Sequence, residues 1–136
     1  MTAAVGKLPV TEDEWLARYI LRRDHVRPDG TVKPDPFIPY KRVELSVTRH
    51  IDLEEADIWK IGQTVANKRA SLLHGRADAR VAVFLGQRLR VAAAPLIDDP
   101  NHANVLGWPP DKQRQKEIAV EIVKEVHYKE KPAATP

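Results

Sequence analysis

The 136-residue chain contains no cysteine. This absence excludes a disulfide framework, a thiolate nucleophile and a zinc site built on cysteine ligands. Glycine is also scarce, with 6 residues against 11 prolines, which indicates stiff connections between elements. A chain of this length buries roughly two thirds of its unfolded surface, so one domain can fold without a metal or a disulfide.

Long apolar runs are missing as well. No segment approaches the roughly 18 apolar residues needed to cross a bilayer. Residues 1–7 lack the apolar stretch of a signal peptide. We therefore expect a cytoplasmic protein, of bacterial origin, that has no membrane partner.

Four common catalytic and cofactor motifs are absent, namely GxxxxGK[ST], GxGxxG, HExxH and GxSxG. Their absence argues against P-loop nucleotide hydrolysis, Rossmann-type redox chemistry, zincin proteolysis and α/β-hydrolase chemistry. No cofactor is predicted. The sequence does not decide whether the protein is an enzyme, although the balance favours a non-enzyme.

The charge is weakly basic, with a net charge of +3 and a pI near 9.3. Basic and acidic residues number 9 and 7 in residues 1–50, 7 and 7 in residues 51–100, and 6 and 5 in residues 101–136. A grip on phosphates usually needs several cations on one face. Because folding can still gather scattered arginines, an electrostatic nucleic-acid binder is kept as a second alternative function.

The N-terminal half opens with a helix signal. Thr11 and Glu14 have the spacing of a capping box, and Trp15, Leu16, Tyr19 and Ile20 fall on one helical stripe, so we predict a helix over 12–22. The next elements are predicted from turn residues and from alternation of apolar side chains. They are a hairpin with Val26 and Val32 on its arms, a rigid proline-rich crossing at 33–39 anchored by Phe37 and Ile38, and a strand over 42–49.

The second half is predicted in the same way. A helix starts at Asp52, and Gly62 in its interior suggests that another backbone approaches closely. Residues 79–85 have the composition of a central strand, which Gly86-Gln87 would turn into an antiparallel partner at 88–93. A strand near 103–106 and a helix that runs from Pro110 to about residue 129 complete the list.

This order predicts an α+β fold, with about three helices packed on a small, mainly antiparallel sheet of 3–5 strands. The predicted single domain covers residues 11–129. Residues 1–10 are expected to be a flexible arm, and residues 130–136 a flexible tail.

The segment 98–110 is the leading candidate for a functional site, because polar, imidazole and aromatic groups are concentrated in it. His102 can act as general base or acid, oriented by Asp98 or Asp99. The favoured alternative is a turn, since Asp99-Pro100-Asn101 is turn-forming in its own right and Asn104 can cap locally. Trp108 is interpreted as a cover for the core, with ligand stacking as the other possibility.

Three histidines stand at the ends of predicted elements: His50, His74 and His102. If they met beside a carboxylate, they would suit Zn²⁺, Mn²⁺ or Fe²⁺, and a bound water could become a nucleophile. Their scattered positions disfavour a metal, so no metal site is predicted. A small metal- or histidine-dependent hydrolase or nuclease is the first alternative function.

Arginines supply the candidate binding surface. Arg88 and Arg90 lie on one face of the predicted strand, and Arg80 would join them from the paired strand. Arg76 or Arg49 can bind an anion beside His102. The leading prediction is a small binding or accessory module that engages a partner protein or an anionic ligand through these arginines, Asn104 and Trp108. Homo-oligomers are compatible with it.

Overall fold

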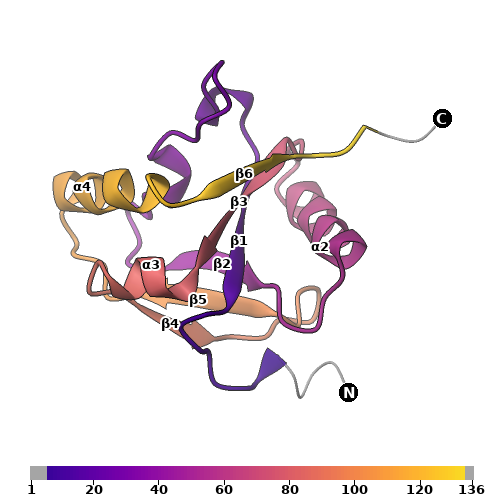
Figure 1. The fold of residues 1–136 in the computed structure, drawn as a ribbon, viewed down its shortest axis with the longest axis horizontal. Coiled ribbons are helices and arrows are strands. Elements are labelled where there is room, and N and C mark those ends of the chain that lie inside the picture. The colour runs from indigo at the N-terminus through magenta and orange to yellow at the C-terminus, as the bar shows by residue number, and fades with distance from the viewer. Residues whose placement is uncertain (1–5, 134–136) are drawn as a thin grey trace.

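The computed structural model describes residues 6–133, and its centre is one six-stranded sheet in which every neighbouring pair is antiparallel (Figure 1). The order across the sheet is β4-β5-β2-β1-β3-β6. The strands are β1 (Trp15–Ile20), β2 (Leu45–Arg49), β3 (Gly75–Arg80), β4 (Arg90–Ala93), β5 (His102–Leu106) and β6 (His127–Glu130).

Three α-helices and two short 3₁₀ turns belong to the described part of the chain. They are α2 (Glu55–Lys68), α3 (Val81–Leu85), α4 (Lys112–Val123), η1 (Arg23–His25) and η2 (Asp35–Phe37). The predicted α+β class is confirmed, and the sheet has one strand more than the upper limit of the prediction. No helix of residues 6–133 is long and apolar enough to span a bilayer.

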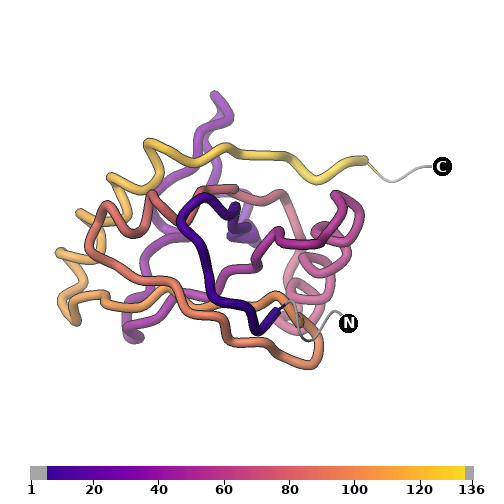
Figure 2. Tube along the Cα trace, turned by 60° about the horizontal axis from the view of Figure 1, so that its bottom comes forward, coloured from indigo at the N-terminus to yellow at the C-terminus, as the bar shows by residue number. Residues whose placement is uncertain are grey.

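The sheet has a hydrophobic core on each face. Figures 1 and 2 place α2 and α4 at opposite ends of the molecule with the strands between them. The core on the α3 and α4 side contains Leu16, Ile20, Phe37, Phe84 and Ile122. The core on the α2 side contains Ala17, Tyr19, Ile58, Ala66 and Leu73.

The predicted helix over 12–22 is wrong, because these residues form β1. The backbone N–H of Thr11 does donate to the Glu14 carboxylate, at 2.7 Å, as in a capping box. Strand β1 nevertheless pairs with β2 on one side and with β3 on the other. Since both faces of the sheet are covered, Leu16 and Tyr19 are both buried, and the strand loses the alternation that would have identified it.

The predicted hairpin of 79–85 and 88–93 is also wrong. Strand β3 ends at Arg80, the apolar run after it is the short helix α3, and β4 pairs with β5. The segment Gly86-Gln87 closes this helix, since the backbone N–H groups of Gly86 and Leu89 donate to Ala82 and Phe84. A short apolar run has the same composition in a buried helix as in a buried strand.

The C-terminal helix is shorter than predicted. Helix α4 ends at Val123. Instead of continuing the helix to residue 129, the chain forms β6 (His127–Glu130) against β3. Residues 1–5 of the predicted arm and 134–136 of the predicted tail lie outside the described residues.

Several other predictions are confirmed. A β-bridge joins Val26 to Val32, Phe37 is fully buried, and strands occupy 45–49 and 102–106. Helix α2 is present, but its N-cap is Glu54 in place of the predicted Asp52. At Gly62 a side chain, the ring of Tyr19, makes the close approach, and not another backbone.

Candidate functional site

The candidate site lies where the sheet splits between β1 and β2. These two strands pair only at Leu16 with Arg49 and at Ala17 with Thr48. Beyond Ala17, β1 continues beside β3 alone, while the first residues of β2 pair with β5 alone. The backbone carbonyl groups along the split therefore need partners other than a neighbouring strand.

Arg18 supplies one such partner, for Ser46 of β2, and it also binds the 3₁₀ turn η2. Its Nε donates to the carbonyl oxygen of Pro36 at 2.7 Å, and its Nη1 donates to the carbonyl oxygen of Ser46 at 3.0 Å. Its Nη2 makes no hydrogen bond to the described residues, and Arg18 forms no ion pair with a carboxylate among them. Arg18 therefore holds the split in place and keeps an uncommitted donor.

The guanidinium of Arg18 has protein on most sides and opens into a pocket at Nη2, and the residue as a whole is half-buried. Burial, together with the positive charge of Arg69, lowers the pKa of Arg18 to about 10. The group still carries its charge at neutral pH. A charge in such surroundings is costly unless an opposite charge accompanies it, and in residues 6–133 Arg18 has only the two carbonyl oxygens.

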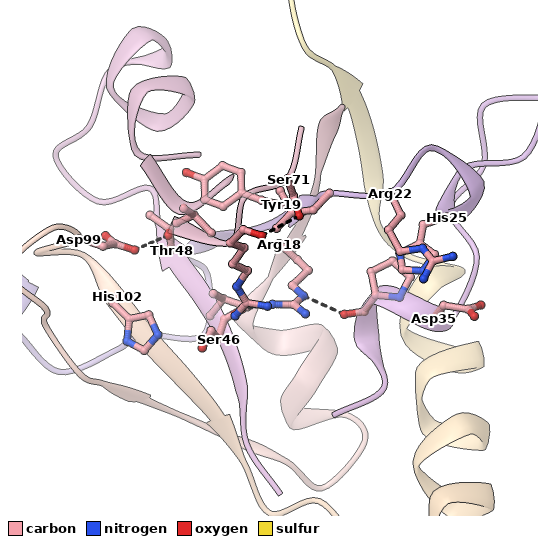
Figure 3. A pocket seen from close by; sticks show the side chains of 15 residues that line it. Arg18, Tyr19, Arg22, His25, Asp35, Ser46, Thr48, Ser71, Asp99 and His102 are labelled. Carbon is pink, nitrogen blue, oxygen red and sulfur yellow. Dashed lines mark hydrogen bonds between the residues drawn. The ribbon is translucent and has the colours of Figure 1, made fainter. Parts of the chain in front are cut away.

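A pocket of about 270 Å³ opens at the split, which we call the Arg18 pocket. Figure 3 shows Arg18 in the middle of it, with one group of polar side chains on each side. Strands β2 and β5 and the loop before β5 supply the first group, and the segment from Arg22 to η2 supplies the second. The polar lining residues are Arg18, Tyr19, Arg22, His25, Asp35, Ser46, Thr48, Arg69, Ser71, Asp99 and His102.

The charges of the lining leave a positive excess. Three guanidinium groups stand against two carboxylates, those of Asp35 and Asp99. Burial lowers the pKa of His25, so its imidazole is neutral at pH 7. Arg22 is also paired with Asp24 outside the lining, at 2.9 Å, which offsets this excess. Arg18, and Arg69 at the end of α2, are the guanidinium groups of the lining that form no ion pair with a carboxylate of the described residues.

Asp99 and His102 are the two predicted site residues that reach this pocket. Asp99 accepts from the Thr48 hydroxyl at 2.5 Å and from the backbone N–H of Asn101 at 3.1 Å, and burial raises its pKa. The Nδ1 of His102 lies 2.8 Å from the carbonyl oxygen of Ala94. We assign the ring proton to Nδ1 on that contact, which leaves Nε2 with its lone pair in the neutral ring.

The other predicted residues of segment 98–110 have structural contacts. Asp98 pairs with Lys68 at 2.6 Å, and this hydrogen bond lowers the pKa of Asp98. Trp108 is buried in the core and donates from Nε1 to the carbonyl oxygen of Val105 at 3.0 Å, as expected for a cover on the core. Asn104 is half-buried in β5 opposite Ser46 and does not line the Arg18 pocket.

Arg76 and His50 belong to a second pocket on the α2 side of the sheet. The Nε of Arg76 donates to both carboxylate oxygens of Asp78, at 3.0 and 3.1 Å, and its Nη2 pairs with Glu55 at 2.6 Å. The His50 Nε2 lies 3.3 Å from Asp78, without hydrogen-bond geometry. Two carboxylates therefore compensate the charge of Arg76, in contrast to that of Arg18.

The three histidines do not converge on one pocket. His102 lines the Arg18 pocket, His50 lines the second pocket, and His74, just before β3, lines neither. Residues 6–133 contain no group of three His, Cys, Asp or Glu side chains that could hold a metal ion.

Arg80, Arg88 and Arg90 do not share one face of a hairpin, as the sequence had predicted. Arg80 is in β3 and stacks on Trp15 with its Cζ 4.8 Å from the ring centroid, and three strands lie between β3 and β4. Arg88 lies in the turn before β4 with a positive φ of 62°. Arg90 is exposed in β4.

The sequence reasoning missed Arg18 and Arg69. A signal for Arg18 is present in the sequence, since it is the one charged residue in the apolar run Trp-Leu-Ala-Arg-Tyr-Ile. In a helix such a residue lies on the solvated face, whereas in a strand between two cores it is buried and needs partners. Arg69 has no comparable signal, because only the fold brings the end of α2 over the split.

Comparison of the chain with protein-family models, with curated proteins and with solved structures found no match.

Proposed function

We propose that this protein is a small binding module whose Arg18 pocket holds an anionic ligand. The observation that carries the proposal is the Arg18 guanidinium, which lines the pocket, carries its charge and has no carboxylate partner among the described residues. A negatively charged group at Nη2 would compensate this charge and form a charge-assisted hydrogen bond, which is stronger than a neutral one.

The polar contacts of the pocket favour binding over hydrolysis. In the common serine or threonine hydrolase arrangement, the nucleophilic hydroxyl is hydrogen-bonded to a histidine that removes its proton. The Thr48 hydroxyl donates to Asp99, and no serine or threonine hydroxyl within residues 6–133 is hydrogen-bonded to a histidine. The anionic ligand can be a free small molecule or an acidic group on a partner protein, since both offer the same chemistry to Arg18.

The test measures stabilisation by small anions. The melting temperature of the full chain is recorded at constant ionic strength with chloride replaced stepwise by acetate, phosphate or sulfate. A ligand that binds the folded state alone stabilises it by about 2.7 kcal/mol at a hundred times its Kd. We expect at least one anion to raise the Tm with saturation.

The variant Arg18→Met should remove this effect, because it keeps a long side chain in the split but no charge. Arg90→Met removes an exposed arginine of β4 and is the matched control. Anions should raise the Tm of this variant as much as they raise the Tm of the wild type. If Arg18→Met fails to fold, Arg69→Met removes the neighbouring charge at the exposed end of α2 and should weaken binding. No stabilisation by any anion, or equal stabilisation of wild type and Arg18→Met, would contradict the proposal.

A further inference from the structure

We infer, resting on the proposed function, that the ligand of the Arg18 pocket is a monocarboxylate with an apolar body. The charge of the lining is the first reason. Arg22 is paired with Asp24, whereas Arg18 has no carboxylate partner among the described residues, so the charge of Arg18 is the one that a ligand would compensate. A single carboxylate neutralises it, whereas a phosphate monoester brings about −1.5 to −2 at pH 7 and would leave negative charge next to Asp35 and Asp99.

The walls of the pocket are the second reason. Leu21, Pro36 and Val65 line it together with the polar groups. Arginines add their alkyl stems to such a wall while keeping their charged ends on the ligand. Tyr19 is fixed beside the pocket because its hydroxyl donates to the carbonyl oxygen of Ile58 at 2.6 Å. An inorganic anion would leave these apolar surfaces in water, whereas a hydrocarbon body would cover them.

The size of the pocket fits such a ligand. A cavity of about 150 Å³ accepts benzene, and the Arg18 pocket measures about 270 Å³. A carboxylate that carries a chain of five or six carbons or one aromatic ring therefore fits inside. Arg18 also limits the headgroup, because Nε and Nη1 already donate to backbone carbonyl oxygens and Nη2 is the nitrogen left free.

The experiment is a titration of the full chain, followed by calorimetry and by amide NMR shifts, with acetate, butyrate, hexanoate and benzoate. Hexanamide is the uncharged match for hexanoate, and inorganic phosphate is the competing headgroup. Burial of each methylene should tighten Kd by about two- to fourfold. We expect hexanoate to bind at least tenfold tighter than acetate, and hexanamide and phosphate to bind more weakly than hexanoate.

The variant Val65→Thr keeps the shape of the apolar wall but places a hydroxyl on it. It should reduce the preference for hexanoate over acetate while leaving the affinity for acetate unchanged. The matched control is Val43→Thr, an exposed valine outside the pocket, which should leave both affinities as in the wild type.

The outcomes separate this inference from the proposed function. Equal affinity for all alkanoates, or tighter binding of phosphate than of hexanoate, would overturn the apolar monocarboxylate and leave an anion site. Equal binding of hexanamide and hexanoate would overturn both, because the charge at Arg18 would then play no part. Absence of binding by every anion would also overturn both. Oligonucleotide binding that falls steeply with salt and survives Arg18→Met would instead indicate the electrostatic nucleic-acid alternative.

Discussion

Arg18 shows how one side chain can serve the fold and a site at once. Its Nη1 donates to the Ser46 carbonyl group of β2, its Nε donates to the Pro36 carbonyl group of η2, and its Nη2 stays available. Arg76, a buried arginine of β3, is paired with Asp78 and Glu55 and stacks over the Trp59 ring, with its Cζ 4.6 Å from the centroid. The charge of Arg76 is therefore compensated by carboxylates of the protein, whereas the charge of Arg18 is left for a ligand to compensate.

At the scale of the residue, Asp99 makes the stability of the fold depend on pH. Burial raises its pKa in the folded protein above the unfolded value of about 3.9. A raised pKa means that the protonated carboxyl favours the folded state, so this contribution is present below the unfolded pKa and is lost as the pH rises through the folded pKa. Asp99→Asn removes the charge and keeps one oxygen acceptor, for Thr48 or for the Asn101 N–H. We expect the Tm of the variant relative to wild type to be higher at pH 7 than near pH 3.5, measured by circular dichroism.

Glu121→Gln is the control for this experiment. Glu121 pairs with Lys124 at an exposed position of α4, with 49% and 63% of the two side chains accessible. Exposed pairs of this kind contribute about 0–1 kcal/mol, so this variant should stay close to wild type at both pH values. A constant Tm difference for Asp99→Asn across the pH range would show that the carboxylate is not penalised by burial.

At the scale of the element, the contact between α2 and β1 gives a second prediction. A Cβ added at Gly62 would lie 2.5 Å from Cε1 of Tyr19. Alanine gains about 1 kcal/mol over glycine in a helix interior, but overpacking costs typically about 1–3 kcal/mol. We expect Gly62→Ala to lower the free energy of unfolding by about 1 kcal/mol in urea denaturation, because α2 cannot approach β1 as closely.

The matched substitution is Gly86→Ala, at the end of α3. Its φ is −62°, and the nearest atom to an added Cβ is 3.4 Å away. This variant should be neutral or slightly stabilising. A Gly62→Ala protein as stable as wild type would mean that the Tyr19 ring moves aside at little cost.

The helices and strands also show which local sequence signals were sufficient to predict them. Alternation identified β2, and the predicted start of the last helix at Pro110 is one residue from the N-cap of α4, Asp111. The capping-box residues Thr11 and Glu14 form their contact, but Glu14 also binds Arg49, at 2.8 Å, and the chain continues as a strand. A cap signal describes a local hydrogen bond, and long-range pairing decides whether a helix or a strand comes after it.

At the scale of the whole molecule, the sheet has two kinds of strand. Strands β1, β2, β3 and β5 have a partner on both sides, and β4 and β6 lie at the edges. Local opening is easiest where few buried contacts and many exposed hydrogen bonds occur. In native-state hydrogen exchange by NMR, we expect the β1 amides that donate to β3 to be the most protected strand amides, since β1 and β2 pair at two positions only, and the amides of β4 and β6 to exchange at least tenfold faster.

Amides of β6 that exchange as slowly as those of β1 would contradict this expectation. The comparison needs no variant, because β1 and β6 both flank β3 in the same molecule.

The sequence alone determined the class of the fold, because hydrophobic patterning and turn residues are local properties. It also pointed to Asp99 and His102, since polar residues in a segment that cannot be a helix stand out locally. Only the tertiary structure decided that residues 15–20 are a strand between two cores, which depends on what covers each face. It alone brought Arg18 and Arg69 to one pocket, because the split between β1 and β2 results from strand pairing across the whole sheet.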